Sequence, residues 1–99
     1  MLINYSDRAV QDLEKIFAYI ARDQKSHAKT FLNNLKNKIE LLALFPDMGV
    51  ECRRKQIPID GRLLIYEDYL IFYRARGGNI LILRVLHASV NIRAWSSIT

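Results

Sequence analysis

The amino-acid sequence predicts an α+β domain with an N-terminal strand, an antiparallel helical hairpin packed on an antiparallel sheet, and a short C-terminal helix. Two observations support this prediction. Apolar residues recur with helical spacing between residues 7 and 44, and two apolar runs between residues 69 and 87 flank Arg76-Gly77-Gly78-Asn79. The chain has 99 residues, so we expect one domain, 1–99, with a single hydrophobic core.

The first expected elements are a strand over residues 2–5 and a helix over residues 7–22. Ser6 is placed to accept a hydrogen bond at the start of the helix, and Asp7 in the first turn suits the helix dipole. One side of this helix is apolar, and the opposite, polar side includes Asp12. The apolar residues follow the spacing i, i+3, i+4, i+7 and are Val10, Leu13, Ile16, Phe17 and Ile20.

A second helix is expected over residues 26–44. The polar link at residues 23–26 is short, so the two helices should be antiparallel neighbours that lay their apolar sides on the sheet. Pro46 ends the helical pattern, because proline lacks an amide hydrogen and disfavours a helical residue before it. The apolar side of the second helix comprises Ala28, Phe31, Leu32, Leu35, Ile39 and Leu42.

Further strands are expected over residues 57–59, 62–66, 69–74 and 80–87. Pro58 restricts the first of them to an edge or an irregular entry. Glu67-Asp68 joins the second and third in a hairpin, and Gly77-Gly78 supplies the positive φ angles of the turn between the third and fourth. The last two strands are apolar on both faces, which places them in the middle of a sheet with cover on each side. A short C-terminal helix is expected over residues 88–98.

Composition excludes several classes of protein. The apolar runs are shorter than the roughly 18 residues needed to cross a bilayer, and the N-terminus lacks a signal-peptide core, so a cytoplasmic protein is expected. Cys52 is the only cysteine, so no intramolecular disulfide can form. The two histidines, His27 and His87, lie far apart without a carboxylate cluster, and the sequence has no glycine-rich phosphate loop. No metal and no cofactor is expected.

The chain has a net charge of +5 and a sequence pI near 9.6. This charge predicts an acidic partner, which is either nucleic acid or an acidic protein. The densest charge run is Glu51-Cys52-Arg53-Arg54-Lys55, and it has no apolar periodicity. We expect this run to form a mobile basic loop.

A set of cationic and phenolic side chains is the remaining candidate for chemistry. Such groups can cleave RNA without a metal if a base deprotonates the ribose 2′-hydroxyl, guanidinium groups stabilise the phosphate and an acid protonates the leaving oxygen. Histidine normally changes charge near neutral pH, which makes His87 the candidate for proton transfer. In the alternative interpretation, the tyrosines belong to the core and His87 caps a strand or faces a partner. The set is Arg62, Tyr66, Tyr73, Arg74, Arg84 and His87.

Several short motifs follow one another along the chain, and together they resemble the RelE/ParE superfamily. These are toxins of bacterial type II toxin–antitoxin modules, and the resemblance covers almost the whole chain. The motifs are Ser6-Asp7-Arg8-Ala9, Asp12-Leu13, Ile16-Phe17-Ala18-Tyr19-Ile20, Phe45-Pro46-Asp47-Met48-Gly49, Tyr69-Leu70-Ile71-Phe72-Tyr73-Arg74 and Ile82-Leu83-Arg84-Val85-Leu86-His87.

Leu70 distinguishes between the two mechanisms of this superfamily. RelE-like members cut mRNA on the ribosome and typically carry an arginine at this position, just before Ile71-Phe72-Tyr73, where it acts on the scissile phosphate. Leucine has no charge to offer, and the loss of such a contact costs roughly a hundredfold or more in rate. The chain therefore resembles the ParE branch more closely.

The resemblance to the ParE branch implies a toxin that inhibits DNA gyrase by binding and is neutralised by a cognate antitoxin. The C-terminal segment of the antitoxin would wrap the basic sheet and helix surface. Many ParE-like chains continue after the histidine with glycine and paired arginines, whereas this chain has Ala88-Ser89-Val90-Asn91-Ile92-Arg93. The residues expected to contact gyrase or the antitoxin are Arg53, Arg54, Lys55, Arg62, Tyr73, Arg74, Arg84, His87, Arg93 and Trp95.

Two other functions stay open. A RelE-like, ribosome-dependent mRNA endonuclease would use His87, Arg84 and Arg62 as catalytic residues, and its partners would be the ribosome and mRNA. A toxin that has lost its activity would bind only its antitoxin. The ParE-like function differs from the endonuclease in being a binding function without an enzyme activity.

Overall fold

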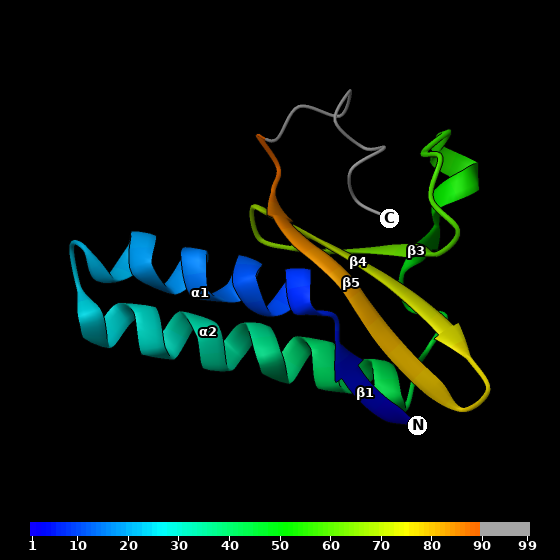
Figure 1. Cartoon of the computed structure of the whole chain (residues 1–99), viewed down its shortest axis with the longest axis horizontal. Coiled ribbons are helices and arrows are strands. Elements are labelled where there is room, and N and C mark those ends of the chain that lie inside the picture. The colour runs from blue at the N-terminus through cyan, green and yellow to red at the C-terminus, as the bar shows by residue number, and fades with distance from the viewer. Residues whose placement is uncertain (90–99) are drawn as a thin grey trace.

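The computed structural model describes residues 1–89 and has two helices packed on a five-stranded sheet, which confirms the α+β prediction (Figure 1). The C-terminal helix expected over residues 88–98 lies outside the described residues, except for Ala88 and Ser89, which form a turn. In chain order the elements are β1 (Leu2–Tyr5), α1 (Asp7–Ala21), α2 (Lys25–Glu40), the 3₁₀-helix η1 (Leu41–Ala43), β2 (Val50–Glu51), the 3₁₀-helix η2 (Cys52–Lys55), β3 (Arg62–Tyr66), β4 (Tyr69–Arg76) and β5 (Asn79–His87).

The strands lie in the order β1-β5-β4-β3-β2. Strands β2 to β5 are antiparallel to one another, as predicted. β1, for which the sequence predicted no pairing, runs parallel to β5, with Leu2 opposite Asn79, so the complete sheet is mixed. A strand of four residues carries no signal for its direction. The long connection through both helices and three strands is what allows the parallel pairing.

The β4–β5 hairpin forms as the glycine pair predicts. Gly77 and Gly78 have φ angles of 56° and 82°, which a two-residue hairpin turn requires and which other residues rarely adopt. β4 and β5 are central strands, because each has a hydrogen-bonded neighbour on both sides. The predicted hairpin between β3 and β4 is also confirmed, with Tyr66 opposite Tyr69.

The helices begin and end close to their predicted bounds. The Ser6 hydroxyl accepts a hydrogen bond of 3.0 Å from the Ala9 amide, so the predicted cap of α1 is confirmed. α2 ends at Glu40 and continues as the 3₁₀-helix η1, which stops before Pro46. Figure 1 shows the two helices side by side, with the loop between them extending beyond the sheet.

The main core lies between the helices and one face of the sheet. Leu13 and Ile16 of α1 are buried there with Leu35 and Ile39 of α2. The sheet contributes apolar side chains from its three longer strands, namely Leu64, Ile71, Ile80, Ile82 and Val85. Most of the predicted apolar sides therefore pack on the sheet, but Val10 is 43% exposed and lines an open groove with the half-buried Phe17.

The second face of the sheet is covered in part by residues 52–59. Cys52 and Ile59 pack there against Leu63, Phe72 and Leu83. The expected mobile basic loop is therefore wrong: this segment forms β2 and η2 and buries the Cys52 side chain.

The strand expected over residues 57–59 is also wrong. Pro58 has no amide hydrogen, and the Ile59 amide donates to the nearby Ile57 carbonyl at 2.8 Å. The backbone at this point therefore makes a local turn instead of pairing with the sheet.

Candidate partner-binding surfaces

Arg84 is held by α1 and belongs to an internal ion pair. Its Nε and Nη2 donate to the two carboxylate oxygens of Asp12 at 2.8 and 3.0 Å. The hydrogen bond to Asp12 raises the pKa of Arg84, and Asp12 itself is only 6% exposed. The Arg84 charge is therefore largely neutralised within the protein.

This ion pair sits on a bulge in β5. Phe72 is paired with Arg84 and Tyr73 is paired with Ile82, so Leu83 is an extra residue of β5 without a paired residue on β4. Asp12 also accepts the Val85 amide at 2.9 Å, and the Ser6 hydroxyl donates to the Leu83 carbonyl at 2.8 Å. Two backbone groups at the bulge, the Val85 amide and the Leu83 carbonyl, thus form hydrogen bonds with Asp12 of α1 and with its cap, Ser6.

Arg62 and Tyr73 hold the loop after η1. Arg62 Nη1 donates to the Gly49 carbonyl at 2.7 Å, and its Nη2 lies 3.4 Å from the Asp47 carboxylate. The Tyr73 hydroxyl donates to the Pro46 carbonyl at 2.7 Å and accepts the Gly49 amide at 2.9 Å. Tyr73 is fully buried, so the expectation that it contacts a partner is not met in this fold.

The other predicted cations gather, together with Arg76, at the β2–β3–β4 end of the sheet, which we call the arginine edge. Arg53 and Arg54 pair with Glu51, and the Arg53 hydrogen bond is the main cause that lowers the pKa of Glu51. Arg74 Nε donates to the Asp60 carbonyl at 2.7 Å. The edge has six cations and three carboxylates, so it keeps a net positive charge. Its cations are Arg53, Arg54, Lys55, Arg62, Arg74 and Arg76, and its carboxylates are Asp47, Glu51 and Asp60.

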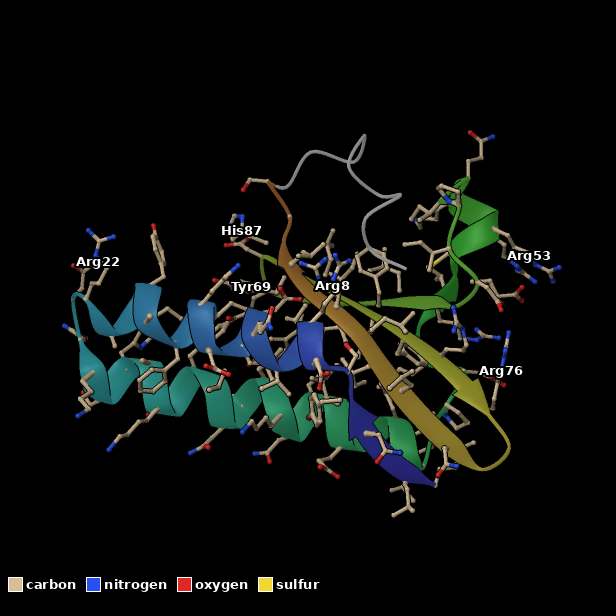
Figure 2. The ribbon with its side chains drawn as sticks, in the orientation of Figure 1. Arg8, Arg22, Arg53, Tyr69, Arg76 and His87 are labelled. Carbon is tan, nitrogen blue, oxygen red and sulfur yellow. The ribbon has the colours of Figure 1, made fainter. Side chains whose placement is uncertain are left out.

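Figure 2 shows His87 far from Arg53 and Arg76 of the arginine edge. His87 lines a groove beside α1. Its ring meets the Tyr69 ring edge-on, with 5.3 Å between the centroids. His87 is opposite Tyr69, whereas Arg62 is opposite Tyr73, four residues or about 13 Å further along β4. The structure therefore does not bring together the three residues proposed for RNA cleavage. Arg93 and Trp95 lie outside the described residues.

Two open grooves border α1, and sequence patterning identified neither of them. The first, which we call the His87 groove, has a volume of about 500 Å³ and is lined by Lys15, Ile16, Tyr19, Tyr69, His87 and Ser89. The second, which we call the helix groove, has a volume of about 490 Å³ and lies along α1 and α2. It is mostly apolar and is lined by Tyr5, Val10, Leu13, Glu14, Phe17, Leu32 and Lys36.

The described residues offer no obvious place for a metal or a membrane span. Within residues 1–89, His, Cys, Asp and Glu do not gather in any group of three that could hold a metal ion. None of the helices in this part of the chain is long and apolar enough to cross a membrane.

Comparison with known proteins identifies a family. Residues 3–92 match the sequence family described as "ParE toxin of type II toxin-antitoxin system, parDE". The fold resembles a chain in the solved structure entitled "Chromosomal ParDE TA system from P. aeruginosa", with a TM-score of 0.72 and 22% identity. That similarity covers 88% of this chain and 95% of the other. No curated protein matches the chain in sequence.

Proposed function

The chain belongs to the ParE toxin family of type II toxin–antitoxin systems, and on this basis we propose that it inhibits DNA gyrase by binding it in the cytoplasm. A cognate antitoxin would neutralise it. Gyrase inhibition is the function that the resemblance to the ParE branch implied, and membership of a toxin–antitoxin family supports neutralisation by an antitoxin.

The state of Arg84 is the observation that favours binding over RNA cleavage. A phosphate-stabilising guanidinium must be free to reach the substrate, but Arg84 donates two hydrogen bonds to Asp12 and its side chain is only 17% exposed. Arg62 is similarly engaged with the Gly49 carbonyl. Of the three residues proposed for cleavage, only His87 presents an exposed side chain.

Leu70 supports the same choice. It is partly buried against the second core cluster, with Phe72 and Leu83, and supplies no charge at the position where RelE-like toxins carry arginine. Arg84 is bound to Asp12, and Arg62 is bound to the loop after η1. Either guanidinium would have to leave its present partner before it could supply the charge that Leu70 lacks.

The helix groove and the arginine edge suit a segment of antitoxin that is both amphipathic and acidic. An amphipathic helix binds by laying its apolar side in a groove of this kind. Acidic residues flanking that helix would be attracted to the net positive charge of the edge. Neutralisation would then consist of covering surfaces that the free toxin leaves open.

A paired assay tests the proposal. The purified toxin is incubated with gyrase, supercoiled plasmid and ATP, and in parallel with ribosomes programmed with mRNA. We expect trapped, cleaved plasmid and intact message. Message cut at the ribosomal A site, with unaffected supercoiling, would overturn the proposal in favour of the endonuclease.

The variant His87→Ala distinguishes the two functions in the same assay. Gyrase inhibition should stay within about threefold of the parent protein, because truncating an exposed side chain outside the central contacts usually costs below 1 kcal/mol. An endonuclease that relied on His87 for proton transfer would lose about a hundredfold or more. His27→Ala, on the exposed start of α2, is the matched control.

A further inference from the structure

A row of cations and one tyrosine follows a single side of α1 and its C-cap. Arg8, Lys15, Tyr19 and Arg22 are separated by seven, four and three residues, so all four project from the same side of the helix. Each is exposed, and Tyr19 is 70% exposed. We call this row the α1 stripe. It is about 21 Å long at the helical rise of 1.5 Å per residue.

The charges of the α1 stripe are available to a partner. Among the described residues, Arg8, Lys15 and Arg22 form no ion pair. Two carboxylates of α1, Asp7 and Glu14, each precede a stripe cation by one residue and so lie about 100° away around the axis. Glu14 in fact lines the helix groove on the other side of α1. Asp12, which is nearest to the stripe, is already bound to Arg84.

The His87 groove opens at the middle of the α1 stripe. Lys15 and Tyr19 form one wall of the groove, and Tyr69, His87 and Ser89 form the other. Burial raises the pKa of Tyr69, and the nearby Tyr19 phenol and Asp68 carboxylate add to this effect. In Figure 2, Tyr69 and His87 lie between Arg8 and Arg22 along α1, while Arg53 and Arg76 lie at the far end of the molecule.

His87 presents a hydrogen-bond donor in this groove. The Ser89 amide donates to His87 Nδ1 at 3.1 Å and the Ser89 hydroxyl lies 2.7 Å from the same atom, so Nδ1 is the acceptor and Nε2 carries a hydrogen. Nε2 makes no hydrogen bond to the described residues. The groove thus combines aromatic rings, an ammonium group and an imidazole with an unengaged ring nitrogen among the described residues.

We propose that the α1 stripe and the His87 groove bind a single-stranded nucleic acid. One base stacks on the exposed Tyr19 ring, and Arg8, Lys15 and Arg22 contact phosphates on either side of it. Cations that track a backbone, with an aromatic ring between them, are the elements that single-strand-binding proteins combine. An acidic peptide would use the cations but would leave the exposed ring without a planar partner. This inference is independent of gyrase inhibition, and the protein binds the strand without cleaving it.

Fluorescence anisotropy with a labelled twelve-residue oligothymidylate tests the proposal. We expect the single strand to bind more tightly than a duplex of the same length, and Tyr19→Ala to weaken single-strand binding by about 5- to 100-fold. Phe45→Ala removes another exposed aromatic ring, in the loop after η1, and should leave binding unchanged. Equal binding of duplex and single strand, or an effect of Tyr19→Ala below twofold, would overturn the proposal.

The salt dependence of the same binding tests the cations. Lys15→Gln and Arg22→Gln should each reduce the slope of log affinity against log salt by about 0.7, the value for one phosphate contact on a single strand. Lys29→Gln makes the same charge change on the exposed side of α2 and should leave the slope unchanged. The proposal fails if the three variants change the slope by the same amount. It also fails if polyglutamate displaces the strand while Tyr19→Ala has no effect, because the site would then bind acidic partners in general. Thermal melting by circular dichroism confirms that each variant is folded.

Discussion

Asp12 joins helix α1 to the bulge of β5. Its carboxylate accepts the Val85 amide and two hydrogen bonds from Arg84, whose side chain is only 17% exposed. A charge in such a position is stable only while its partner is present, because water cannot replace the lost interaction. The pair therefore contributes to stability at the place where a partner-binding role was predicted for Arg84.

Asp12→Asn should lower the free energy of unfolding by about 2 to 4 kcal/mol, because it leaves Arg84 without an ionised partner. Urea denaturation measures this loss. Glu14→Gln removes one negative charge from an exposed position of the same helix and should change the free energy by less than about 0.5 kcal/mol. Equal losses in the two variants would mean that net charge, and not the ion pair, is responsible.

Sequence patterning placed Asp12 on the polar, exposed side of its helix, whereas the structure buries it. Asp12 is one residue from Leu13 and four from Ile16, so it lies at the border of the apolar side. Whether a border residue is buried depends on what covers it. Here the cover is Val85, which is 73 positions away in the chain, and no local pattern predicts a bulge at that distance.

Tyr73 makes stability sensitive to alkaline pH. Burial is the main cause that raises the pKa of its phenol in the folded protein. The stabilisation is complete below the unfolded pKa of about 10 and is lost as the pH rises through the higher folded pKa. We expect the free energy of unfolding to fall above about pH 10 in urea titrations.

Tyr73→Phe checks the origin of this fall. It removes the two hydrogen bonds to the loop after η1 and should cost about 1 to 3 kcal/mol at neutral pH. The dependence on alkaline pH should become weaker but should persist in part, because burial also raises the pKa values of Tyr5 and Tyr69. If the pH profile of Tyr73→Phe is unchanged, the loss of stability at alkaline pH comes from Tyr5 and Tyr69 and not from Tyr73.

Among the elements, the helices and the β4–β5 hairpin could be predicted from the sequence. Helical spacing fixes which side of α1 and α2 is buried, and Gly77-Gly78 permits one kind of turn. β2 and the direction of β1 could not be predicted. Both are two to four residues long, and their pairing is decided by strands that are distant in the chain.

Truncating Phe72 tests how much the packing on the second face of the sheet contributes to stability. Phe72 is fully buried with Leu63 and Leu83, so Phe72→Ala should cost about 3 to 5 kcal/mol, out of about 5 to 10 for a domain of this size. Urea denaturation and an amide NMR spectrum report the loss. Ile65→Ala, at a 57% exposed position on the neighbouring β3, should cost no more than about 1 kcal/mol. A small effect at Phe72 would mean that the second face contributes little to the core.

Over the described part of the molecule, the possible binding surfaces lie on different sides. The helix groove and the α1 stripe border opposite sides of α1, since Val10 and Arg8 are two residues or about 200° apart around its axis. The arginine edge lies at the other end of the sheet (Figure 2). Mutations can therefore test each surface separately. The sequence could not predict this separation, because net charge does not show where on the protein a partner binds.

Val10→Glu tests whether the helix groove is the surface that the antitoxin covers. Val10 is 43% exposed at the groove and glutamate is a good helix former, so the fold should tolerate the change. A carboxylate in an apolar contact would have to be desolvated on binding, which should weaken antitoxin affinity by about a hundredfold. The antitoxin is taken from the neighbouring reading frame, and its affinity is measured by titration calorimetry.

Gln11→Glu provides the control, because it adds the same charge at the next, exposed position of α1 and turns it away from the groove. If the groove is the antitoxin surface, cells that express the Val10→Glu toxin should no longer be rescued by the antitoxin, whereas cells with Gln11→Glu should be. Gyrase inhibition by both variants should match that of the parent, since the assay contains no antitoxin. Loss of gyrase inhibition in Val10→Glu alone would instead assign the groove to gyrase, and equal rescue of both variants would place the antitoxin elsewhere on the toxin.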